Sequence, residues 1–437
     1  MANSELDKLT DHKVDHLFLL IGENPLPNYV SAHLLLNKGG TPYLVNTTGT
    51  NKQAERLRNI LQNDLFGSNA AELISLGEYE SDGYHIQDVI CQVAVNLSPS
   101  DKLGLHYTGG TKAMAVHAYR AMLSLKLPDV VFSYLDPRRL EMCIDREDSD
   151  RIRIKIKPDD LQVNLAKIFQ IHGWAWKDNS EPIYEAEMPI AAKAFADFHT
   201  DGNLVKLWRD WCNQVLRQEA RDPKDKNKWL KEADLENVSE LSLGMLKESQ
   251  KIDDVLADLG NEEENLSLSI VRDKGFRSLR SVCNWLDGEW LEHYVLQQVK
   301  EIADSKLIHE SATSFWIKDP NNPKNDKFQF DVAFMRGYQL FAISCTTIDR
   351  KPDCKSKLFE AYIRAQQLGG TEARVALVCC VDSKGVNALR TEIVNVLRSE
   401  PESTVKNTKL IVWGRDDLID LSQKISEWID ENESDAK

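Results

Sequence analysis

Residues 105–114, LHYTGGTKAM, decide the fold of the amino-terminal part of the chain. The apolar run that ends at Tyr107 predicts a strand and residues 113–123 predict a helix, so a strand-to-helix loop lies between them. The first amides of a helix lack partners within it, and the helix dipole favours an anion there. Two glycines let the backbone approach a ligand, and Lys112 adds positive charge. The spacing is neither GxGxxG nor a Walker loop, so a phosphate site and a threonine-capped turn are equally compatible with it.

The segments around this loop predict a Rossmann-like α/β sheet. Residues 16–155 alternate apolar strand-like runs with helical patterns, and a hairpin around Asp136 closes the unit. Polar loops follow the first two predicted strands, at residues 22–28 and 46–49. Because ligands bind at the carboxyl edge of such sheets, we expect these loops and the glycine loop to form one pocket.

The stretch 105–114 resembles the signature of the CRISPR-associated Rossmann fold (CARF) domain, and the resemblance covers roughly residues 10–155. It implies a homodimer that binds a cyclic oligoadenylate made by a type III CRISPR complex. Cyclic tetra-adenylate is the ring that we expect. A two-fold symmetric ring suits a two-fold interface. The ligand contacts that the resemblance implies are Thr108, Gly109, Gly110, Thr111 and Lys112, together with Asn24 and Asn28.

The composition changes after residue 155. All ten tryptophans follow residue 170, and residues 156–274 are polar, charged and helical in pattern, with little strand signal over 221–236. We therefore expect three parts: the CARF-like domain at 1–155, a helical connector at 156–274 and a second α/β domain at 275–437.

Two carboxylates mark the carboxyl-terminal part. Glu292 lies on a predicted helix and Asp331 on a predicted strand, and such a pair can hold a hard divalent cation for phosphodiester hydrolysis. Taken alone, neither residue can be distinguished from an ordinary acidic side chain on a helix or on the protein surface. The order helix acid, strand Asp, hairpin, strand, helix resembles the PD-(D/E)xK nuclease fold. The resemblance implies a Mg²⁺- or Mn²⁺-dependent nuclease that cuts DNA or RNA, with Glu292 and Asp331 as metal ligands.

The chain departs from that pattern at one place. The triplet matching Glu-x-Lys is Ser344-Cys345-Thr346, and neither hydroxyl replaces the charge of the missing residue. Either Lys355 or Lys357 supplies the cation and Glu292 or Glu360 the second carboxylate, or the site is degraded.

Bulk properties limit the alternatives. The net charge of −15 over 437 residues argues against a high-affinity, sequence-independent nucleic-acid coat. No apolar run reaches the roughly 18 residues of a membrane span, and the polar first residues do not resemble a signal peptide, so we expect a cytoplasmic protein. The eight cysteines lack zinc-site spacing and are expected to be buried thiols.

Three hypotheses follow. The first is a homodimeric nuclease activated by cyclic oligoadenylate. The second is a ligand-responsive regulator whose nuclease fold is inactive. The third is a ring nuclease that destroys the cyclic oligoadenylate within the sensor domain.

Overall fold

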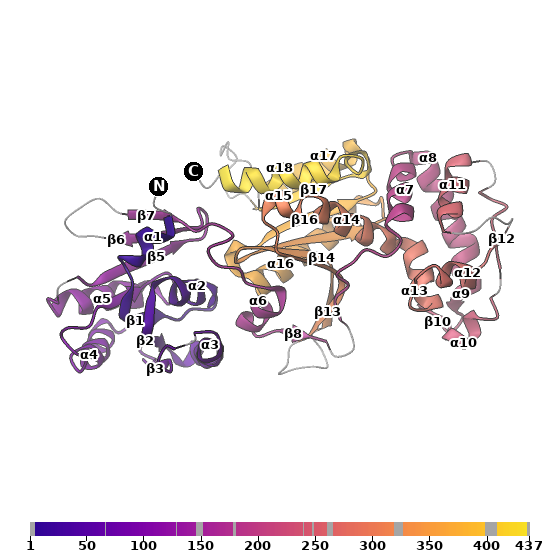
Figure 1. The fold of residues 1–437 in the computed structure, drawn as a ribbon. Coiled ribbons are helices and arrows are strands. Elements are labelled where there is room, and N and C mark those ends of the chain that lie inside the picture. Colours follow the sequence, from indigo (N-terminus) through magenta and orange to yellow (C-terminus); the bar gives the residue numbers. More distant parts are fainter. Residues whose placement is uncertain are drawn as a thin grey trace.

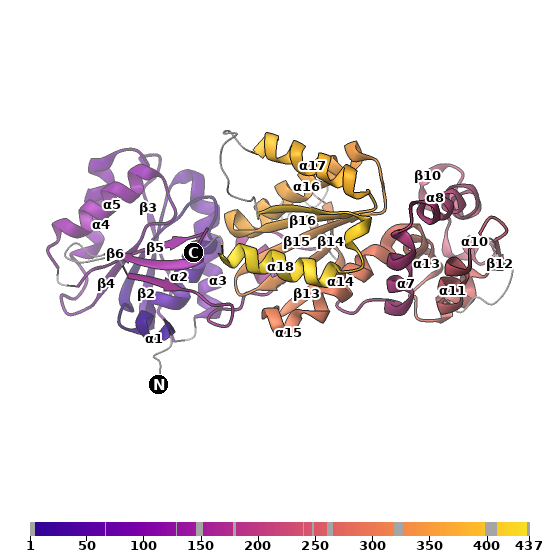
Figure 2. The same cartoon turned by 90° about the horizontal axis from the view of Figure 1, so that it is seen from above.

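A computed structural model describes residues 5–65, 67–127, 129–145, 152–177, 181–238, 240–246, 249–259, 265–318, 327–397 and 409–434. Figures 1 and 2 show an elongated molecule with two sheets side by side and a helical unit at the end away from the amino-terminal sheet. The mixed α/β architecture predicted from the sequence is confirmed.

The first sheet has the strand order β3-β2-β1-β4-β5-β6-β7. The first five of these are parallel, and β6 and β7 are antiparallel additions. Its strands are β1 (Val14–Leu20), β2 (Leu36–Asn46), β3 (Glu72–Ser75), β4 (Leu103–His106), β5 (Val131–Asp136), β6 (Glu141–Asp145) and β7 (Ile152–Lys155). Its helices are α1 (Glu5–Thr10), α2 (Leu26–Leu35), α3 (Asn51–Asp64), α4 (Gly83–Ala94) and α5 (Lys112–Ser124).

Strand β1 is apolar throughout its second half because both of its faces are covered. Leu17 and Leu19 pack in one hydrophobic cluster, and Phe18 and Leu20 pack in another on the opposite face. The strand order reverses beside β1, since β2 follows on one side and β4 on the other. The carboxyl ends of β1 and β4 therefore flank the crevice where ligands bind in such sheets.

The second sheet has the order β17-β16-β15-β14-β13-β8. Its strands are β8 (Ala175–Trp176), β13 (Glu310–Lys318), β14 (Lys327–Arg336), β15 (Gln339–Thr346), β16 (Arg374–Cys379) and β17 (Leu410–Trp413). The strands β15, β16 and β17 are parallel, and the other pairs are antiparallel. One face packs on α16 (Lys351–Gly369) and the other on α14 (Trp290–Glu301) and α18 (Leu421–Ser434); α15 (Ala303–Lys306) and α17 (Ser383–Leu397) complete the unit.

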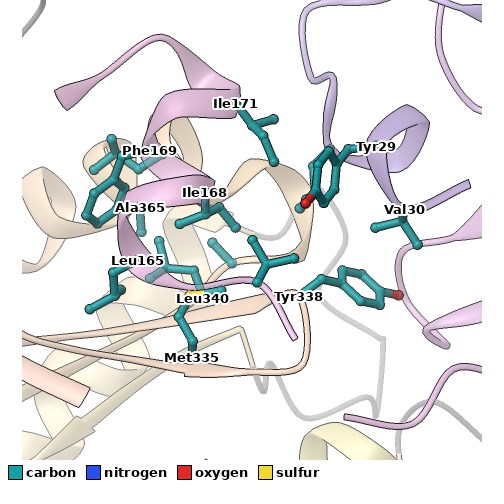
Figure 3. Close-up of a cluster of buried hydrophobic side chains, with 14 of the residues drawn as sticks. Tyr29, Val30, Leu165, Ile168, Phe169, Ile171, Met335, Tyr338, Leu340 and Ala365 are labelled. Atoms are coloured by element: carbon teal, nitrogen blue, oxygen red, sulfur yellow. The ribbon is translucent and has the colours of Figure 1, made fainter. Parts of the chain in front are cut away.

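Helix α6 (Leu165–His172) joins the two sheets into one packed body. Its buried side chains belong to a hydrophobic cluster that also contains Tyr29 and Val30 of the first domain and Leu340 of the second (Figure 3). A salt bridge at the rim adds to this packing, with Lys167 Nζ 2.8 Å from Asp64 Oδ1. The apolar face of α6 thus makes the interface between the domains continuous with their cores.

The stretch 156–274, expected as a connector, is divided in the structure. Its first part supplies α6 and the edge strand β8, and the rest forms a separate helical unit that lies beyond the second sheet (Figure 1). The unit comprises α7 (Pro189–His199), α8 (Gly202–Trp211), η2 (Cys212–Leu216), α9 (Arg217–Ala220), α10 (Glu232–Leu235), α11 (Gln250–Asp258), α12 (Leu268–Asp273) and α13 (Leu279–Asn284), with small strands β9 (Arg221–Asp222), β10 (Asp225–Trp229), β11 (Leu241–Ser242) and β12 (Asn265–Leu266). Residues 221–229, read as having little strand signal, form the hairpin β9–β10, because Trp229 packs under the Arg221 guanidinium.

Among the described helices, none combines the length and the apolar character that crossing a membrane would require.

The interface at α6 leads to a first prediction. Replacing the fully buried Ile168 with alanine should lower the free energy of unfolding by about 2–5 kcal/mol, because the cavity opens between both domains. Chemical denaturation measures this, and the exposed Ile190→Ala is the matched control. A change of under about 0.5 kcal/mol at Ile168 would contradict a common core.

Candidate ligand loop and candidate active site

The glycine loop after β4 lies directly against the end of β1. A Cβ on Gly109 would stand 2.1 Å from the Leu20 carbonyl oxygen, and one on Gly22 would stand 3.0 Å from the Gly110 nitrogen. Gly110 also has φ of +73°, which other residues rarely adopt. Gly22, Gly109 and Gly110 are therefore needed for this close approach of two backbones, which places the loop at the switch point of the sheet.

The loop threonines brace the turn from inside. Thr108 Oγ1 accepts a hydrogen bond from the Leu135 amide at 2.7 Å, and Thr111 Oγ1 caps α5 by accepting one from the Met114 amide at 3.1 Å. Lys112 is exposed at the first position of α5. The backbone and Lys112 thus remain as the surface that an anion would meet.

Two buried asparagine side chains lie at the same edge of the first sheet, and the side-chain oxygen of each accepts no hydrogen bond from the described residues. Asn28 is fully buried and donates to the Leu20 carbonyl at 3.1 Å, while its Oδ1 has no hydrogen-bond partner among the described residues. Asn46, at the end of β2, donates to Asn51, and its Oδ1 likewise finds no partner in the described part of the chain. Buried acceptors of this kind are normally satisfied by water or ligand. The Asn28 side chain lies beside Gly109.

His106 fixes the strand that carries the loop. The imidazole is fully buried, contacts the hydroxyls of Ser31 and Ser133 at 3.0 Å each, and has its pKa lowered to about 3 by burial. It is therefore neutral at pH 7 and ties β4 to α2 and β5.

Asn24 lies away from the glycine loop and against the second domain. Its Nδ2 donates to Glu372 Oε2 at 3.1 Å, and its Oδ1 lies 3.0 Å from His172 Nε2 on α6. Burial raises the pKa of the fully buried Glu372. Of the two asparagines expected at the ligand, Asn28 lies at the loop and Asn24 lies at the domain interface.

In the second domain, Glu292 and Asp331 come together where β13, β14 and α14 meet. Glu292 Oε2 accepts a hydrogen bond from Ser314 Oγ at 2.7 Å, and Thr313 Oγ1 connects it to the Asp331 carbonyl. Ser314 has a left-handed backbone with φ of +55°, a strained conformation that interrupts the strand opposite Asp331. The irregularity turns the serine toward the helix acid.

The Ser344-Cys345-Thr346 triplet completes the site through its backbone and one hydroxyl. Asp331 Oδ2 accepts hydrogen bonds from Ser344 Oγ at 2.9 Å and from the Cys345 amide at 2.7 Å. Thr346 Oγ1 accepts from the Ile348 amide and is 7% exposed, so it supports the turn beyond the strand.

The two candidate lysines on α16 point to different places. Lys357 Nζ lies 3.9 Å from Asp331 Oδ2 and donates to the Cys345 carbonyl at 3.3 Å. Lys355 instead pairs with Glu392 of α17 at 2.9 Å. Lys357 therefore brings to the carboxylates the cation that the triplet lacks.

The electrostatics of this site favour bound positive charge. Burial, then Asp331 and Glu289, raise the pKa of Glu292 well above its ordinary value. Burial, then Glu187 and Asp331, raise the pKa of Glu289 to about 7. Burial alone would lower the pKa of Lys357, but Asp331 and Glu292 raise it, so the ammonium stays charged.

Glu289 was not singled out from the sequence. It stands three residues before Glu292 at the start of the same helix, a spacing that places both acids on one face. The expected substitute Glu360 is exposed on α16 and lines a pocket together with Lys357, Asp331 and Ser344.

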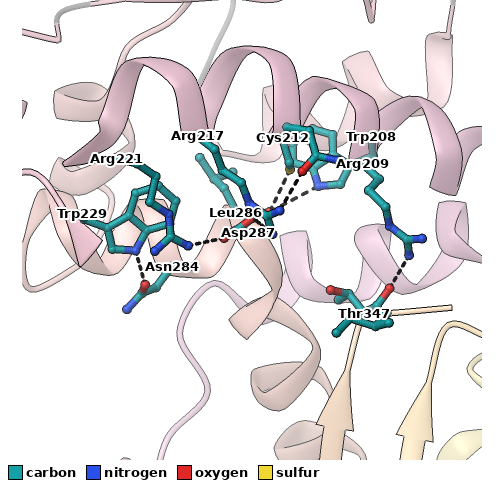
Figure 4. A network of polar contacts seen from close by, with 12 residues as sticks. Trp208, Arg209, Cys212, Arg217, Arg221, Trp229, Asn284, Leu286, Asp287 and Thr347 are labelled. Carbon is teal, nitrogen blue, oxygen red and sulfur yellow. Dashed lines mark hydrogen bonds and ion pairs between the residues drawn. The ribbon is translucent and has the colours of Figure 1, made fainter. Parts of the chain in front are cut away.

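The helical unit holds the start of α14 in place (Figure 4). Asp287 accepts from Arg217 and Arg221 at 2.8 Å each, and the Leu286 carbonyl accepts from Trp208 Nε1 at 3.2 Å. The next residue, Gly288, has φ of +155° and faces Thr347 beyond β15. This break directs Glu289 and Glu292 inward.

A hard divalent cation fits the donor set. Glu292, Asp331 and the Cys345 carbonyl present only oxygen, and a cation would offset the repulsion from Asp331 and Glu289 that, after burial, raises the pKa of Glu292. Among the described residues, no three His, Cys, Asp or Glu side chains already form a metal-binding group. Any ion here would thus be held by two carboxylates with backbone and water.

These two sites define the class of structure: a Rossmann-like domain with a glycine loop, packed on a second α/β domain with a carboxylate–lysine cluster. Two solved structures share the overall fold over nearly the whole chain. Protein VC1899 from Vibrio cholerae aligns with a TM-score of 0.70 at 16% identity, over 95% of this chain and 98% of that one.

Can2 from Sulfobacillus thermosulfidooxidans, solved in complex with cyclic tetra-adenylate, aligns with a TM-score of 0.63 at 15% identity, over 95% of this chain and 99% of that one. Identities this low show a common fold. No family model matches the sequence, and a search of curated proteins finds no match.

The acidic cluster gives a second prediction. Because the pKa of Glu292 is higher in the folded than in the unfolded chain, the free energy of unfolding falls as the pH rises from about 4.5, the unfolded value, to the folded pKa, and the penalty is absent below about pH 4.5. Glu292→Gln should therefore raise the free energy of unfolding at pH 8 by about 1 kcal/mol or more, with little gain at pH 4.5.

Denaturation at both pH values measures the effect, with exposed Glu301→Gln on the same helix as control. A loss of stability at pH 8 would contradict the cluster. Mn²⁺ should raise the melting temperature of the unsubstituted protein more than that of Glu292→Gln.

Proposed function

We propose that the protein is a metal-dependent nuclease switched on by a cyclic oligoadenylate. The observation that carries the proposal is the meeting of Glu292, Asp331 and Lys357 at one point, although the Glu-x-Lys triplet is absent. In this proposal Lys357, which lies 3.9 Å from Asp331, would take the role of the strand lysine of a PD-(D/E)xK site.

Each side chain has a task in phosphodiester hydrolysis. Glu292 and Asp331 would hold a Mg²⁺ or Mn²⁺ ion, which supplies Lewis acidity and an activated water when bound. Ser344 and the Cys345 amide orient the Asp331 carboxylate through two hydrogen bonds. Lys357, charged at pH 7, stabilises the negative charge that develops on the phosphate.

The sensor part of the proposal rests on the glycine loop and on the shared fold with Can2. The loop 108–112 and Asn28 would bind the phosphates and riboses of cyclic tetra-adenylate, with the same loop of a second copy completing a two-fold site. Such a protein would act as a DNA- or RNA-cutting effector in type III CRISPR antiviral defence.

A short path links the two sites. The glycine loop contacts Gly22; two residues later Asn24 binds Glu372; and the Glu372 carbonyl accepts from Gln339 at the start of β15 at 3.0 Å. Strand β15 carries Ser344 at its other end. A ligand that shifts Gly22 would thus bias the strand beneath Asp331.

Cleavage assays test the third prediction. With Mn²⁺ and cyclic tetra-adenylate, the protein should cut labelled single- or double-stranded DNA or RNA, and activity should fall without the ligand. Asp331→Asn should abolish cutting, and Lys357→Ala should lower kcat/KM by about 10²-fold or more. Lys355→Ala, two residues away and paired with Glu392, is the matched control and should retain activity.

Other outcomes identify other functions. Ligand binding without any cutting would indicate a regulator, and loss of the ring itself would indicate a ring nuclease. Cutting that survives Asp331→Asn would overturn the assigned site.

Asn24 gives a fourth prediction. Asn24→Ala removes the bond to Glu372 while leaving the glycine loop intact, so the Kd for cyclic tetra-adenylate should stay within about threefold while activation falls about tenfold. Calorimetry measures the first and cleavage the second, with the exposed Asn63→Ala as control. Equal loss of binding and activation would instead place Asn24 at the ligand.

A further inference from the structure

A pocket of about 280 Å³ opens beside Asp331, between the second sheet and α16. Its walls come from three strands and one helix face: Trp316 of β13, Phe328 to Asp331 of β14, Ala342 to Ser344 of β15, and Lys357, Glu360, Ala361 and Arg364 of α16. The lining residues of α16 are spaced three and four positions apart, so they lie on one face of the helix, and this face lines the pocket.

The pocket lies where strands β14 and β15 stop pairing with each other. Strands β14 and β15 pair from Arg336–Gln339 as far as Val332–Ile343 and then separate. The Asp331 side chain occupies the opening and takes hydrogen bonds from Ser344 and Cys345 across it. One wall of the pocket is therefore the carboxylate of the candidate active site.

Two of the aromatic rings in the lining, Trp316 and Phe328, each have a cation over one face. Lys177 Nζ lies 5.0 Å from the centre of the Trp316 ring, and the Arg364 guanidinium lies 4.6 Å from that of Phe328. Aromatic and guanidinium planes are the surfaces on which proteins stack unpaired bases. Gln329 and Glu360 add groups that can hydrogen-bond to a base edge.

The volume sets the size of the occupant. Ligand pockets span roughly 300–1,000 Å³, so this one, at about 280 Å³, lies just below that range and suits one planar group. Since Lys357 and Asp331 share its wall, the occupant must be covalently close to the phosphate at which water would attack.

We propose that this pocket receives one unstacked base of a single-stranded substrate, from the nucleotide next to the scissile phosphate. The inference rests on the proposed nuclease function and adds its substrate class. A base inside a duplex cannot enter without being flipped, which costs a few kcal/mol of stacking and pairing. Single strands and melted ends are therefore cut in preference to intact duplex.

The test separates base binding from cutting. Full-length protein with cyclic tetra-adenylate is titrated in EDTA with a fluorescent 12-nucleotide single strand, and then with the same strand carrying one abasic site at each position in turn. Cleavage of the same strands is mapped in Mn²⁺. An abasic site should suppress cutting at its adjacent phosphate by about tenfold.

Variants of the pocket sharpen the result. Trp316→Ala should weaken binding and raise KM about tenfold and should remove the sensitivity to abasic sites, since stacking is worth about 1–3 kcal/mol per base. Trp316→Phe keeps a ring and should stay within about threefold, and Arg364→Ala should fall between the two. Tyr84→Ala, an exposed aromatic of the first domain, is the control.

The outcomes are distinct. If Trp316→Ala binds and cuts as the unsubstituted protein does while Asp331→Asn is inactive, the base pocket is wrong and the nuclease proposal stands. If abasic and intact strands bind and are cut alike, the pocket is likewise refuted. If no nucleic acid is cut with ligand and metal present, the proposed function itself fails.

Discussion

The burial of α6 between the two sheets is the interaction on which the rest of the molecule depends. Its apolar side chains belong at once to the core beneath α2 and α3 and to the core beneath α16 (Figure 3). Sheets packed in this way cannot rotate independently without exposing that face to water, which costs about 25 cal/mol per Å². A motion that begins at the glycine loop would therefore reach the second domain as a shift of this packed interface. The hydrogen bond between Asn24 and Glu372 is the polar contact that would shift with it.

The carboxylate cluster of the second domain, in contrast, lowers the stability of the fold. Glu289, Glu292 and Asp331 are held together by the turn at Gly288, the left-handed Ser314 and the arginines that grip Asp287. The buried like charges and the strained backbone of Ser314 are unfavourable, whereas the ion pairs of Asp287 hold the turn in place. The hydrophobic cores of the second domain and of the helical unit supply the stability that keeps the carboxylates in place.

Much of this architecture could be predicted from the sequence, because the strands and helices of both sheets follow strong local periodicity. Asp331 and Glu292 were placed correctly on a strand and a helix, and the structure brings them together. The choice between Lys355 and Lys357 could not be made, since it depends on which face of α16 meets the sheet. The contact of Asn24 with Glu372 spans 348 residues and has no local signal. The helical character of residues 156–274 was predicted, but an amphipathic pattern does not reveal which surface a helix covers, so the position of the helical unit beyond the second sheet could not be predicted.

The path of the chain around that helical unit has an evolutionary consequence. The chain leaves the second sheet after the bridge between Ile183 and Thr313, builds the unit, and returns at α14 to the same sheet. By topology the unit is an insertion, and its two ends are anchored on one domain. Related proteins could therefore lengthen, shorten or replace it without disturbing the first sheet, provided that the ion pairs of Asp287 are kept. Divergence in size between such proteins should concentrate there.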